Sequence, residues 1–359
     1  FNNKIVFSAE KYCWPDDTLK DKYPQVDNDF KFLNSGGFIG TFEQIKKLVE
    51  KPILPSDDDQ LYYTHRFLEN QNDIVLDYKA KIFQTLSGCS ISDFNFNLTK
   101  SVFKNKFGNI PSLLHGNGGK KDKMLINQIS NYFPYKWREI YGYFGKSIKK
   151  ETKNILVSFF ALNQNFNESH ISFLNQCLQN RYKLFIYNPT CLQLNRWYNS
   201  LKNKNGIVYF HIDDIRSARI NSLEIAKNLN CSYYFTTSNE FILKPDIIKT
   251  LLTRDKNCIG PLLRKNNSDW SNIWMSVDDK GFYKRSFDYL SIVKGERKGV
   301  WNCTYINNCF LLKRELFQDA IKGYKSYLNL DVDMSICQYF RDKYIFMFAD
   351  NLEYYGKVL

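Results

Sequence analysis

The feature of this sequence that most restricts its fold is an alternation of apolar and amphipathic segments from Ile155 onward. The apolar segments predict strands over residues 155–160, 183–187, 233–236 and 258–262. The segments between them predict helices over residues 170–178, 222–229 and 246–252. Strands this apolar, separated by helices, are typical of a mostly parallel sheet covered on both faces. The second half of the chain is therefore predicted to be an α/β domain.

The first half shows a less regular version of the same pattern. A strand is expected over residues 5–9, a helix capped by Thr41 runs to about Val49, and the aspartates after Ser56 open a helix over residues 61–69. Short strands follow at residues 73–77 and 80–84. Residues 91–110 are predicted to be a polar connection, and residues 124–143 a bridging helix. We therefore expect one domain over residues 1–126, a linker over 127–150 and a second domain over 151–359.

The composition excludes several classes of protein. Hydrophobic residues make up 43% of the chain and charged residues 24%, as in globular proteins, and no apolar run reaches the roughly 18 residues of a membrane span. The net charge of +13 is uneven, with +1 on residues 1–126 and +12 on the remainder. That asymmetry favours an acidic partner, although a solvated Lys-rich surface explains it equally. Basic blocks interleaved with aromatic residues are missing, so we expect no nucleic-acid partner.

The cysteines and asparagines give weaker indications. Nine cysteines without C-x-x-C spacing argue against a zinc cluster, and their odd number leaves at least one thiol outside any intrachain disulfide. Five sites match the N-glycosylation pattern, at Asn97, Asn167, Asn230, Asn266 and Asn302, a number that an Asn-rich chain also reaches by chance. The chain starts at Phe1 and enters a strand at once, so we interpret it as a fragment that begins inside a domain.

Three polar clusters in the first half follow predicted strands or open predicted helices. They are Glu10 with residues 14–17, residues 34–37 with residues 57–60, and residues 115–121. In an open α/β sheet, ligands bind at the carboxyl ends of the strands, so we expect the three clusters to meet there. The paired glycines Gly36 and Gly37 between apolar residues indicate a backbone that packs closely against a ligand or another strand.

The segment after His115 has the composition of a metal–diphosphate site. Imidazole is a good ligand for a divalent metal, Gly118 and Gly119 allow backbone amides to approach a ligand, and Lys120 and Lys121 neutralise phosphate. A glycine-rich surface turn is the alternative. With Asn34, Asp58 and the aromatic Trp14, these residues match the needs of a nucleotide-sugar transferase, but an Asp-x-Asp-like metal clamp is missing.

These segments resemble the procollagen lysyl hydroxylase/glycosyltransferase family. In the first half the matching segments are Phe7-Ser8-Ala9-Glu10, Cys13-Trp14-Pro15, residues 32–40, residues 57–64, Leu76-Asp77, Ile82-Phe83-Gln84 and His115-Gly116-Asn117-Gly118. In the second half they are Gly260-Pro261-Leu262, residues 270–274, Tyr283, Arg285-Ser286, Asp288-Tyr289, residues 299–302, Asp333-Met334 and residues 340–343. The resemblance covers nearly the whole chain.

The resemblance implies an N-terminally truncated GT-A-like glycosyltransferase domain followed by a second, Rossmann-like accessory domain of GT-A-like form. It implies Mn²⁺-dependent transfer of glucose from UDP-glucose to galactosyl-hydroxylysine of a collagen-like protein, with retention at the sugar carbon. His115 corresponds to the metal-binding histidine, and Gly118, Gly119, Lys120 and Lys121 to the diphosphate loop. Trp14, Asn34 and Asp59 lie on segments that face the sugar or acceptor, and Glu10, Asp57 and Asp58 are the candidate catalytic residues.

The chain also departs from the family pattern. The family's metal-binding aspartates belong upstream of the first strand, Gly119-Lys120 replaces the usual Pro-Thr, and Thr237-Ser238-Asn239 stands where an Asp-x-Asp would lie in the accessory domain. We therefore expect this chain alone to bind UDP and Mn²⁺ poorly and its accessory domain to be non-catalytic. The hydroxylase domain has no counterpart before Leu359.

Several alternatives and lesser expectations remain at this stage. A non-catalytic scaffold or collagen-binding module, or a transferase for another UDP-sugar or acceptor, would fit the same pattern. The resemblance implies a secretory-pathway protein, in the lumen of the endoplasmic reticulum, and a homodimer is a further expectation. Single residues carry structural expectations: core or interface positions for Trp270, Trp274 and Trp301, a loop for Asp331 and Asp333, and structural or surface roles for His65, His170 and His211.

Overall fold

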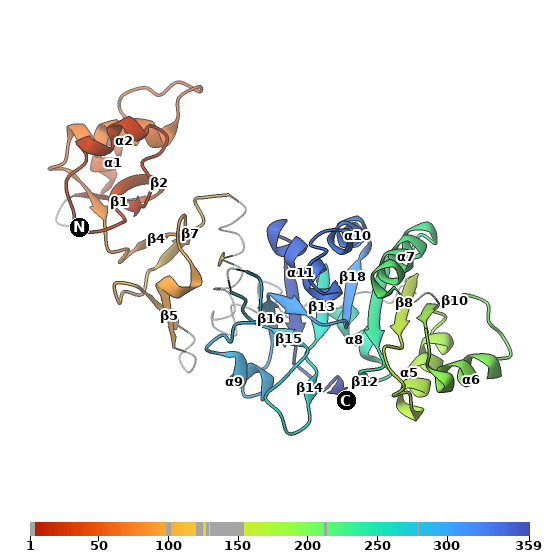
Figure 1. The fold of residues 1–359 in the computed structure, drawn as a ribbon. Coiled ribbons are helices and arrows are strands. Elements are labelled where there is room, and N and C mark those ends of the chain that lie inside the picture. The colour runs from red at the N-terminus through yellow and green to blue at the C-terminus, as the bar shows by residue number, and fades with distance from the viewer. Residues whose placement is uncertain are drawn as a thin grey trace. The chain divides into compact units, whose positions relative to one another are not determined.

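The chain forms two compact units in a computed structural model, residues 1–134 and residues 135–359. The structure describes residues 4–97, 102–119, 125, 126, 129, 154–211, 214–278 and 280–359 (Figure 1). The expected bridging helix over residues 124–143 and the expected linker over 127–150 therefore lie almost entirely outside the described residues. Within the described ranges, no helix is both long and apolar enough to cross a membrane.

The first unit contains a five-stranded sheet with a mixed arrangement. Strand β1 (Ile5–Glu10) pairs on one side with β2 (Phe32–Ile39) and on the other with β3 (Ile74–Asp77) and then β4 (Phe83–Thr85), beyond which lies β7 (Leu113–His115). Strand β2 runs antiparallel to β1, whereas β1, β3, β4 and β7 are parallel to one another. Consequently the carboxyl ends of β1, β4 and β7 and the beginning of β2 share one edge of the sheet.

Short helices with well-defined caps accompany this sheet. Helix α1 (Phe42–Leu48) begins with a capping box between Thr41 and Gln44, as expected from the sequence. Helix α2 (Asp59–Glu69) begins at Asp58, whose carboxylate accepts a hydrogen bond from the Leu61 amide at 2.9 Å. Its inner face buries Phe67 and, one and two turns earlier, the polar Thr64 and Gln60. Between β1 and β2, η1 (Asp17–Lys22) forms a 3₁₀ helix.

The prediction that residues 91–110 lack regular structure was wrong. After η2 (Ile91–Asp93), strands β5 (Phe94–Asn97) and β6 (Val102–Asn105) pair as an antiparallel hairpin. The rings of Phe94 and Phe103 lie 5.6 Å apart between centroids, in an edge-to-face contact. This aromatic packing stabilises the hairpin. The Phe-Asn-Phe-Asn alternation of β5 has the period of a strand, which the high asparagine content obscured.

The second unit contains an eight-stranded sheet. Its order is β10 (Ile207–Phe210), β9 (Lys183–Tyr187), β8 (Ile155–Phe160), β11 (Tyr233–Ser238), β18 (Phe310–Lys313), β13 (Cys258–Pro261), β19 (Met347–Asp350) and β16 (Val300–Cys303). Strands β10 to β11 are parallel, β18 is antiparallel to both of its neighbours, and β16 is antiparallel to β19. The predicted α/β domain is confirmed, with antiparallel strands that the sequence pattern did not reveal.

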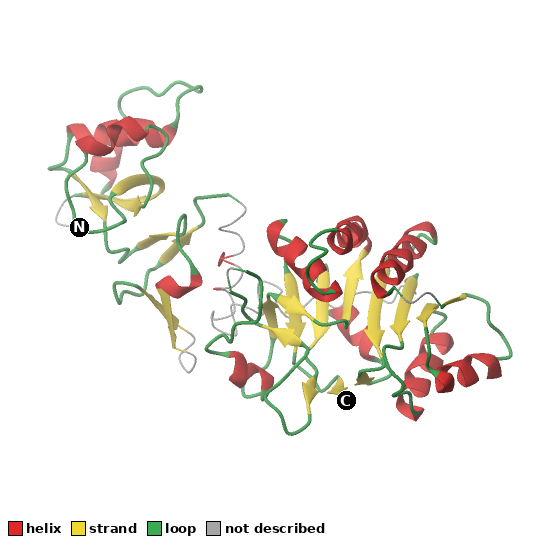
Figure 2. Ribbon diagram, in the orientation of Figure 1, coloured by secondary structure: helices red, strands yellow, loops and turns green. Residues whose placement is uncertain are grey.

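Helices cover both faces of the large sheet (Figure 2). Side chains of α7 (Ile215–Asn228), α10 (Phe317–Lys325) and α11 (Val332–Asp342) share one hydrophobic core with Leu156 and Phe160 of β8. Side chains of α5 (Glu168–Gln179), α6 (Leu192–Ser200) and α8 (Ile247–Thr253) share the other core with Val157 and Phe159. Successive residues of β8 thus enter opposite cores, which explains why five of its six residues are apolar.

Smaller elements complete the second unit. A three-stranded sheet joins β12 (Phe241–Leu243), β20 (Gly356–Val358) and β14 (Arg264–Lys265), and a two-stranded sheet joins β15 (Ile273–Trp274) and β17 (Tyr305–Ile306). Helix α9 (Tyr289–Val293) and the 3₁₀ turn η4 (Arg314–Leu316) complete the set. None of the nine cysteines forms a disulfide, and seven of them are buried.

One expectation for this unit was wrong. Asp331 and Asp333 do not lie in a loop: Asp331 caps α11, and Asp333 lies in the first turn of that helix. Trp301 is buried in the core, whereas 43% of Trp270 is exposed.

Candidate functional site

Polar side chains from four elements meet at the edge of the first sheet where β1, β4 and β7 end. Glu10 is the last residue of β1, Asn34 belongs to β2, Gln60 to the first turn of α2 and His115 is the last residue of β7. Asn117 follows β7 and reaches back to Glu10. The three polar clusters recognised in the sequence therefore contribute to one hydrogen-bonded network, which we call the Glu10 network.

Glu10 lies at the centre of this network and is almost fully buried. Its Oε1 accepts hydrogen bonds from Nε2 of Gln60 at 2.7 Å and from Nδ2 of Asn34 at 3.1 Å. Its Oε2 accepts one from Nδ2 of Asn117 at 2.7 Å. Three converging amide donors form an environment that is complementary to an ionised carboxylate. The carboxylate is held in one orientation, with its charge stabilised by neutral dipoles.

Backbone amides fix the orientation of each of these side-chain amides. The Gly36 N–H donates to Oδ1 of Asn34 at 3.1 Å, and the Ser35 N–H donates to Oε1 of Gln60 at 3.2 Å. The N–H groups of Leu86 and Ser87 donate to Oδ1 of Asn117 at 3.1 and 2.9 Å. Because a backbone N–H only donates, the oxygens must face it and the NH₂ groups must face Glu10. The network is therefore preorganised by the backbone.

His115 lies directly on the backbone of Gly36. A Cβ atom at position 36 would be 1.7 Å from Cε1 of His115 and 2.2 Å from its Nδ1, so no residue other than glycine fits beneath the ring. Similarly, a Cβ at Gly37 would lie 2.8 Å from the ring of Phe83. The close approach expected for the paired glycines is thus made with side chains of two other strands, His115 of β7 and Phe83 of β4.

A hydrogen bond also fixes the tautomer of His115. Its Nδ1 lies 3.0 Å from Oδ1 of Asn34, an oxygen that only accepts. A neutral His115 consequently carries its proton on Nδ1 and its lone pair on Nε2. Metal-binding histidines are commonly held in this way, with one nitrogen donating to an oxygen acceptor and the other directed at the metal.

His115 is one such ligand at this sheet edge, but one ligand does not make a metal centre. Across the described ranges, no group of three His, Cys, Asp or Glu side chains is arranged to hold an ion. His115 has the chemistry of a single ligand, and Glu10 already accepts hydrogen bonds from three amides. The residues present therefore do not form a complete metal centre by themselves.

The aspartates expected to contact substrate lie at the solvent-exposed beginning of α2. Asp57 accepts a hydrogen bond from the Leu54 amide at 2.9 Å, Asp58 caps the helix, and Asp59 begins it. Of the cluster 57–60, only Gln60 belongs to the Glu10 network. The helix geometry accounts for the positions of Asp57 and Asp58, and it leaves their carboxylates accessible to a ligand.

Trp14 and the glycines after His115 border the network. The Trp14 side chain is 63% exposed, and its carbonyl accepts a hydrogen bond from Gln60 at 3.0 Å. Gly118 is exposed, and Gly119 adopts a positive φ of 76° in open space. Lys120 and Lys121 lie outside the described residues. The described part of the expected diphosphate loop is thus an accessible turn next to His115.

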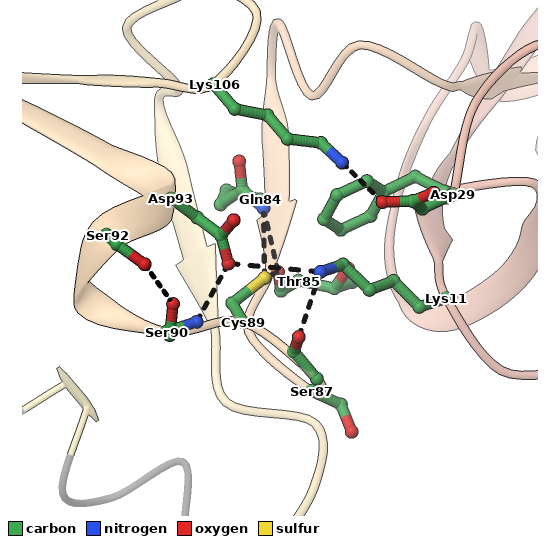
Figure 3. Close-up of polar contacts among 12 residues, drawn as sticks. Lys11, Asp29, Gln84, Thr85, Ser87, Cys89, Ser90, Ser92, Asp93 and Lys106 are labelled. Carbon is green, nitrogen blue, oxygen red and sulfur yellow. Dashed lines mark hydrogen bonds and ion pairs between the residues drawn. The ribbon is translucent and has the colours of Figure 1, made fainter. Parts of the chain in front are cut away.

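Lys11 attaches the end of β1 to the segment that follows β4, and Lys106 makes a separate ion pair nearby (Figure 3). Lys11, next to Glu10, donates to the Gly88 carbonyl at 2.9 Å and lies 3.9 Å from the Asp93 carboxylate. Lys106 pairs with Asp29 at 2.6 Å. Both ammonium groups also lie 5.2 Å from the centre of the Phe30 ring, an arrangement suited to cation–π attraction. The Lys11 contacts limit the movement of Glu10 relative to the 86–88 segment, whose backbone amides bind Asn117.

In the second unit, the end of β11 is closed rather than open to ligands. Thr237, Ser238 and Asn239 are fully buried. The Asn239 amide donates to the carbonyls of Asn163 and Asn165 and accepts from the Leu162 N–H at 2.8 Å. Its hydrogen-bonding groups thus stabilise the loop after β8, and the segment offers no carboxylate to a metal.

Two side-chain amides of the Glu10 network were not among the individual site residues predicted from the sequence. Gln60 and Asn117 lie within segments that the resemblance identified, yet neither was assigned a role. Ser8, which donates to the Asn34 carbonyl at 2.8 Å, was likewise overlooked. The available signal was position: each residue is at, or within two residues of, a strand end or helix beginning at the sheet edge where ligands bind.

Comparisons with known proteins agree with this division of the chain. Residues 1–143 match the family described as PLOD GT domain. Residues 157–350 match the family described as Glycosyltransferase family 25, N-terminal domain. The chain therefore contains two glycosyltransferase-type domains in tandem, as the sequence indicated.

Full-length relatives share similarity with the whole chain. It is 32% identical over 98% of its length to the multifunctional procollagen lysine hydroxylase and glycosyltransferase of Caenorhabditis elegans. It is 30% identical over its full length to procollagen-lysine,2-oxoglutarate 5-dioxygenase 2 of Homo sapiens. The chain spans 52% of the length of each. Among solved structures, S. aureus TarS 1-349 matches 57% of this chain and 60% of that chain, with 8% identity and a TM-score of 0.36.

Proposed function

Since the chain belongs to the procollagen lysyl hydroxylase/glycosyltransferase family, we propose that its first unit contributes to a glucosyltransferase site. The proposed reaction transfers glucose from UDP-glucose to galactosyl-hydroxylysine of a collagen-like acceptor, with retention at the sugar carbon. The observation that carries this proposal is the Glu10 network, in which a buried carboxylate, three amides and an imidazole meet at one sheet edge.

The chemistry of sugar transfer accounts for this combination of groups. The transition state has oxocarbenium-like character, and a fixed carboxylate stabilises the positive charge that develops at the sugar carbon. Glu10 is our candidate for that role, because the three amides hold it in place before substrate binds. Exposed Asp57 and Asp58, with Trp14, are proposed to contact the sugar hydroxyls and the acceptor.

We further propose that His115 supplies one ligand to a Mn²⁺ ion that binds the donor diphosphate. Its support is the Nδ1–Asn34 hydrogen bond, which leaves the lone pair of a neutral imidazole on Nε2. Gly118, Gly119, Lys120 and Lys121 would bind the diphosphate. Carboxylate ligands would have to come from segments other than those described here.

The second unit is proposed to be a non-catalytic accessory domain. The closed end of β11, where Asn239 is occupied by the 162–165 loop, supports this assignment. The family relationship further suggests a protein of the secretory pathway, in the lumen of the endoplasmic reticulum. We also propose a homodimer there, as well as glycans on some of the five Asn-x-Ser/Thr sites.

The test is a transfer assay with UDP-glucose, Mn²⁺ and a galactosyl-hydroxylysine peptide, on the full-length protein that contains this chain. His115→Ala should lower the rate more than tenfold at subsaturating Mn²⁺, and His65→Ala, outside the network, should leave it unchanged. Equal rates for wild type and His115→Ala would contradict the metal assignment. Complete absence of transfer by the wild-type protein, with UDP-galactose as well, would favour the non-catalytic module.

A further inference from the structure

The second unit has an aromatic-walled cavity that the proposed transfer reaction does not use. Its volume is about 420 Å³, and its walls include Trp270, Trp274, Tyr283, Tyr289, Asp269 and Arg285. Ligand sites typically occupy about 300–1,000 Å³, so this cavity is at the lower end of their range and suits one or two small rings. It lies beside β15 and α9, which are labelled in Figure 1.

Packing holds the aromatic walls in place. Trp274 stacks on Tyr305 with 3.9 Å between ring centroids, and β15 and β17, which carry these residues, pair with each other. Tyr283 lies edge-on to Trp274 at 5.5 Å, and the hydroxyl of buried Tyr289 accepts from the Ser271 amide at 3.1 Å. Because these contacts already fix the rings, binding would cost little side-chain entropy.

Two of these rings remain substantially exposed to water. Trp270 is 43% exposed and Tyr283 is 44% exposed, although large aromatic side chains gain much free energy from burial. A concave site that leaves such rings exposed has the character of a ligand-binding surface rather than of a core.

Polar groups beside the rings are only weakly engaged with one another. The Asp269 carboxylate lies 3.8 Å from the Arg285 guanidinium and 3.6 Å from the Lys294 ammonium, and all three side chains are 40–49% exposed. Exposed ion pairs at such distances contribute little stability. The carboxylate oxygens and the guanidinium N–H groups therefore retain the capacity to bind a ligand's hydroxyls at little cost.

We propose that this cavity binds a neutral hexopyranose. A hexopyranose has an apolar C–H face, which packs on an aromatic ring, and adjacent hydroxyls, which suit a carboxylate and a guanidinium side by side. A proline-rich segment would use the aromatic walls but would leave the Asp269–Arg285 pair unsatisfied. With this site, the second unit would recognise a sugar that is already attached to an acceptor. This role does not depend on which unit catalyses transfer.

The experiment measures binding of methyl β-galactoside and methyl glucoside to the full-length protein by saturation-transfer NMR. We expect saturable binding of at least one glycoside, and Trp270→Ala should weaken it roughly three- to tenfold. Trp270→Phe retains a flat ring and should restore most of the affinity, and Asp269→Asn should weaken binding. Tyr354→Ala is the matched control, since Tyr354 is 62% exposed in the same unit but does not line the cavity.

Several results would contradict this proposal, and each differs from the expected one. Equal affinity of wild type and Trp270→Ala, with both variants folded by circular dichroism, would overturn the site. Binding of an unglycosylated Pro-rich collagen-like peptide, without binding of either glycoside, would overturn it in favour of a polypeptide-docking groove. The His115→Ala variant should keep the glycoside affinity whether or not it transfers glucose, so failure of the transfer proposal would not be mistaken for failure of this one.

Discussion

The contact between Gly36 and His115 gives a prediction whose size follows from the structure. In Gly36→Ala, the new methyl group would lie 1.7 Å from Cε1 of His115, so the ring must leave its position. Gly36 does not have a positive φ, so the backbone itself accepts alanine. Overpacking costs about 1–3 kcal/mol, and the lost His115–Asn34 hydrogen bond adds about 1 kcal/mol. We expect Gly36→Ala to destabilise the first unit by about 2–4 kcal/mol.

A double-mutant cycle separates this clash from other effects of alanine. In a His115→Ala background the ring is gone, and Gly36→Ala should be neutral or stabilising by up to about 1 kcal/mol, because alanine restricts the unfolded chain. The coupling between the two positions should therefore be at least about 2 kcal/mol. Transfer activity should be low in all three variants, since each lacks a correctly placed imidazole.

Urea-dependent hydrogen exchange on peptides from β1 and β2 measures the opening free energy of this unit within the full chain. Gly40→Ala is the control, because its Cβ would lie 3.1 Å from Cγ1 of Ile5, the flexible part of a side chain that can shift. It should cost less than about 1 kcal/mol. Additive effects of Gly36→Ala and His115→Ala, within about 0.5 kcal/mol, would refute the proposed contact.

Three further predictions concern buried carboxylates and their partners. Asn117→Asp should lower the transfer rate at least tenfold. A carboxylate would replace the NH₂ group that lies 2.7 Å from Oε2 of Glu10 and would repel it. As a control, Asn72→Asp at an exposed position should have no effect on the transfer rate. Asp77→Ala should destabilise the first unit by about 3 kcal/mol in the same exchange assay, because three backbone N–H groups at residues 81–83 lose their acceptor. Burial raises the pKa of Asp333 to about 6 from 3.8, so its contribution to stability is greatest below pH 4 and is lost as the pH rises through 6, by about 3 kcal/mol in total. Relative to wild type, Asp333→Asn should gain thermal stability between pH 4 and pH 7, and a difference in melting temperature that does not vary with pH would exclude this titration.

The strands and helices with a strong hydrophobic period were predictable. Strand β8 enters two cores with alternate residues, so all of its residues but Ser158 are apolar and identify it without further information. Thr41 likewise identified the beginning of α1, and the aspartates after Ser56 indicated the beginning of α2 to within two residues, because caps and charges at a helix end act within one turn. Properties determined by neighbours in sequence were recovered.

Features that depend on distant partners were not recovered. The three polar clusters were expected to meet at one sheet edge, but the hydrogen bonds of Gln60 and Asn117 to Glu10, which lies 50 and 107 residues away, were not predicted. The β5–β6 hairpin was missed because its aromatic residues alternate with asparagines. From its residue type alone, Trp270 was expected in the core or at an interface, while its actual exposure depends on how the segment around β15 folds.

Because the Glu10 network depends on side-chain amides, slow chemical loss of one amide would inactivate the site. Asn117 precedes Gly118, and an asparagine followed by glycine loses its amide nitrogen by deamidation more readily than most others. The product, aspartate, would set a second negative charge against Oε2 of Glu10 with no mutation in the gene. Ageing of a stored sample would thus inactivate the site gradually, detectable as a gain of about one mass unit in the peptide that contains Asn117.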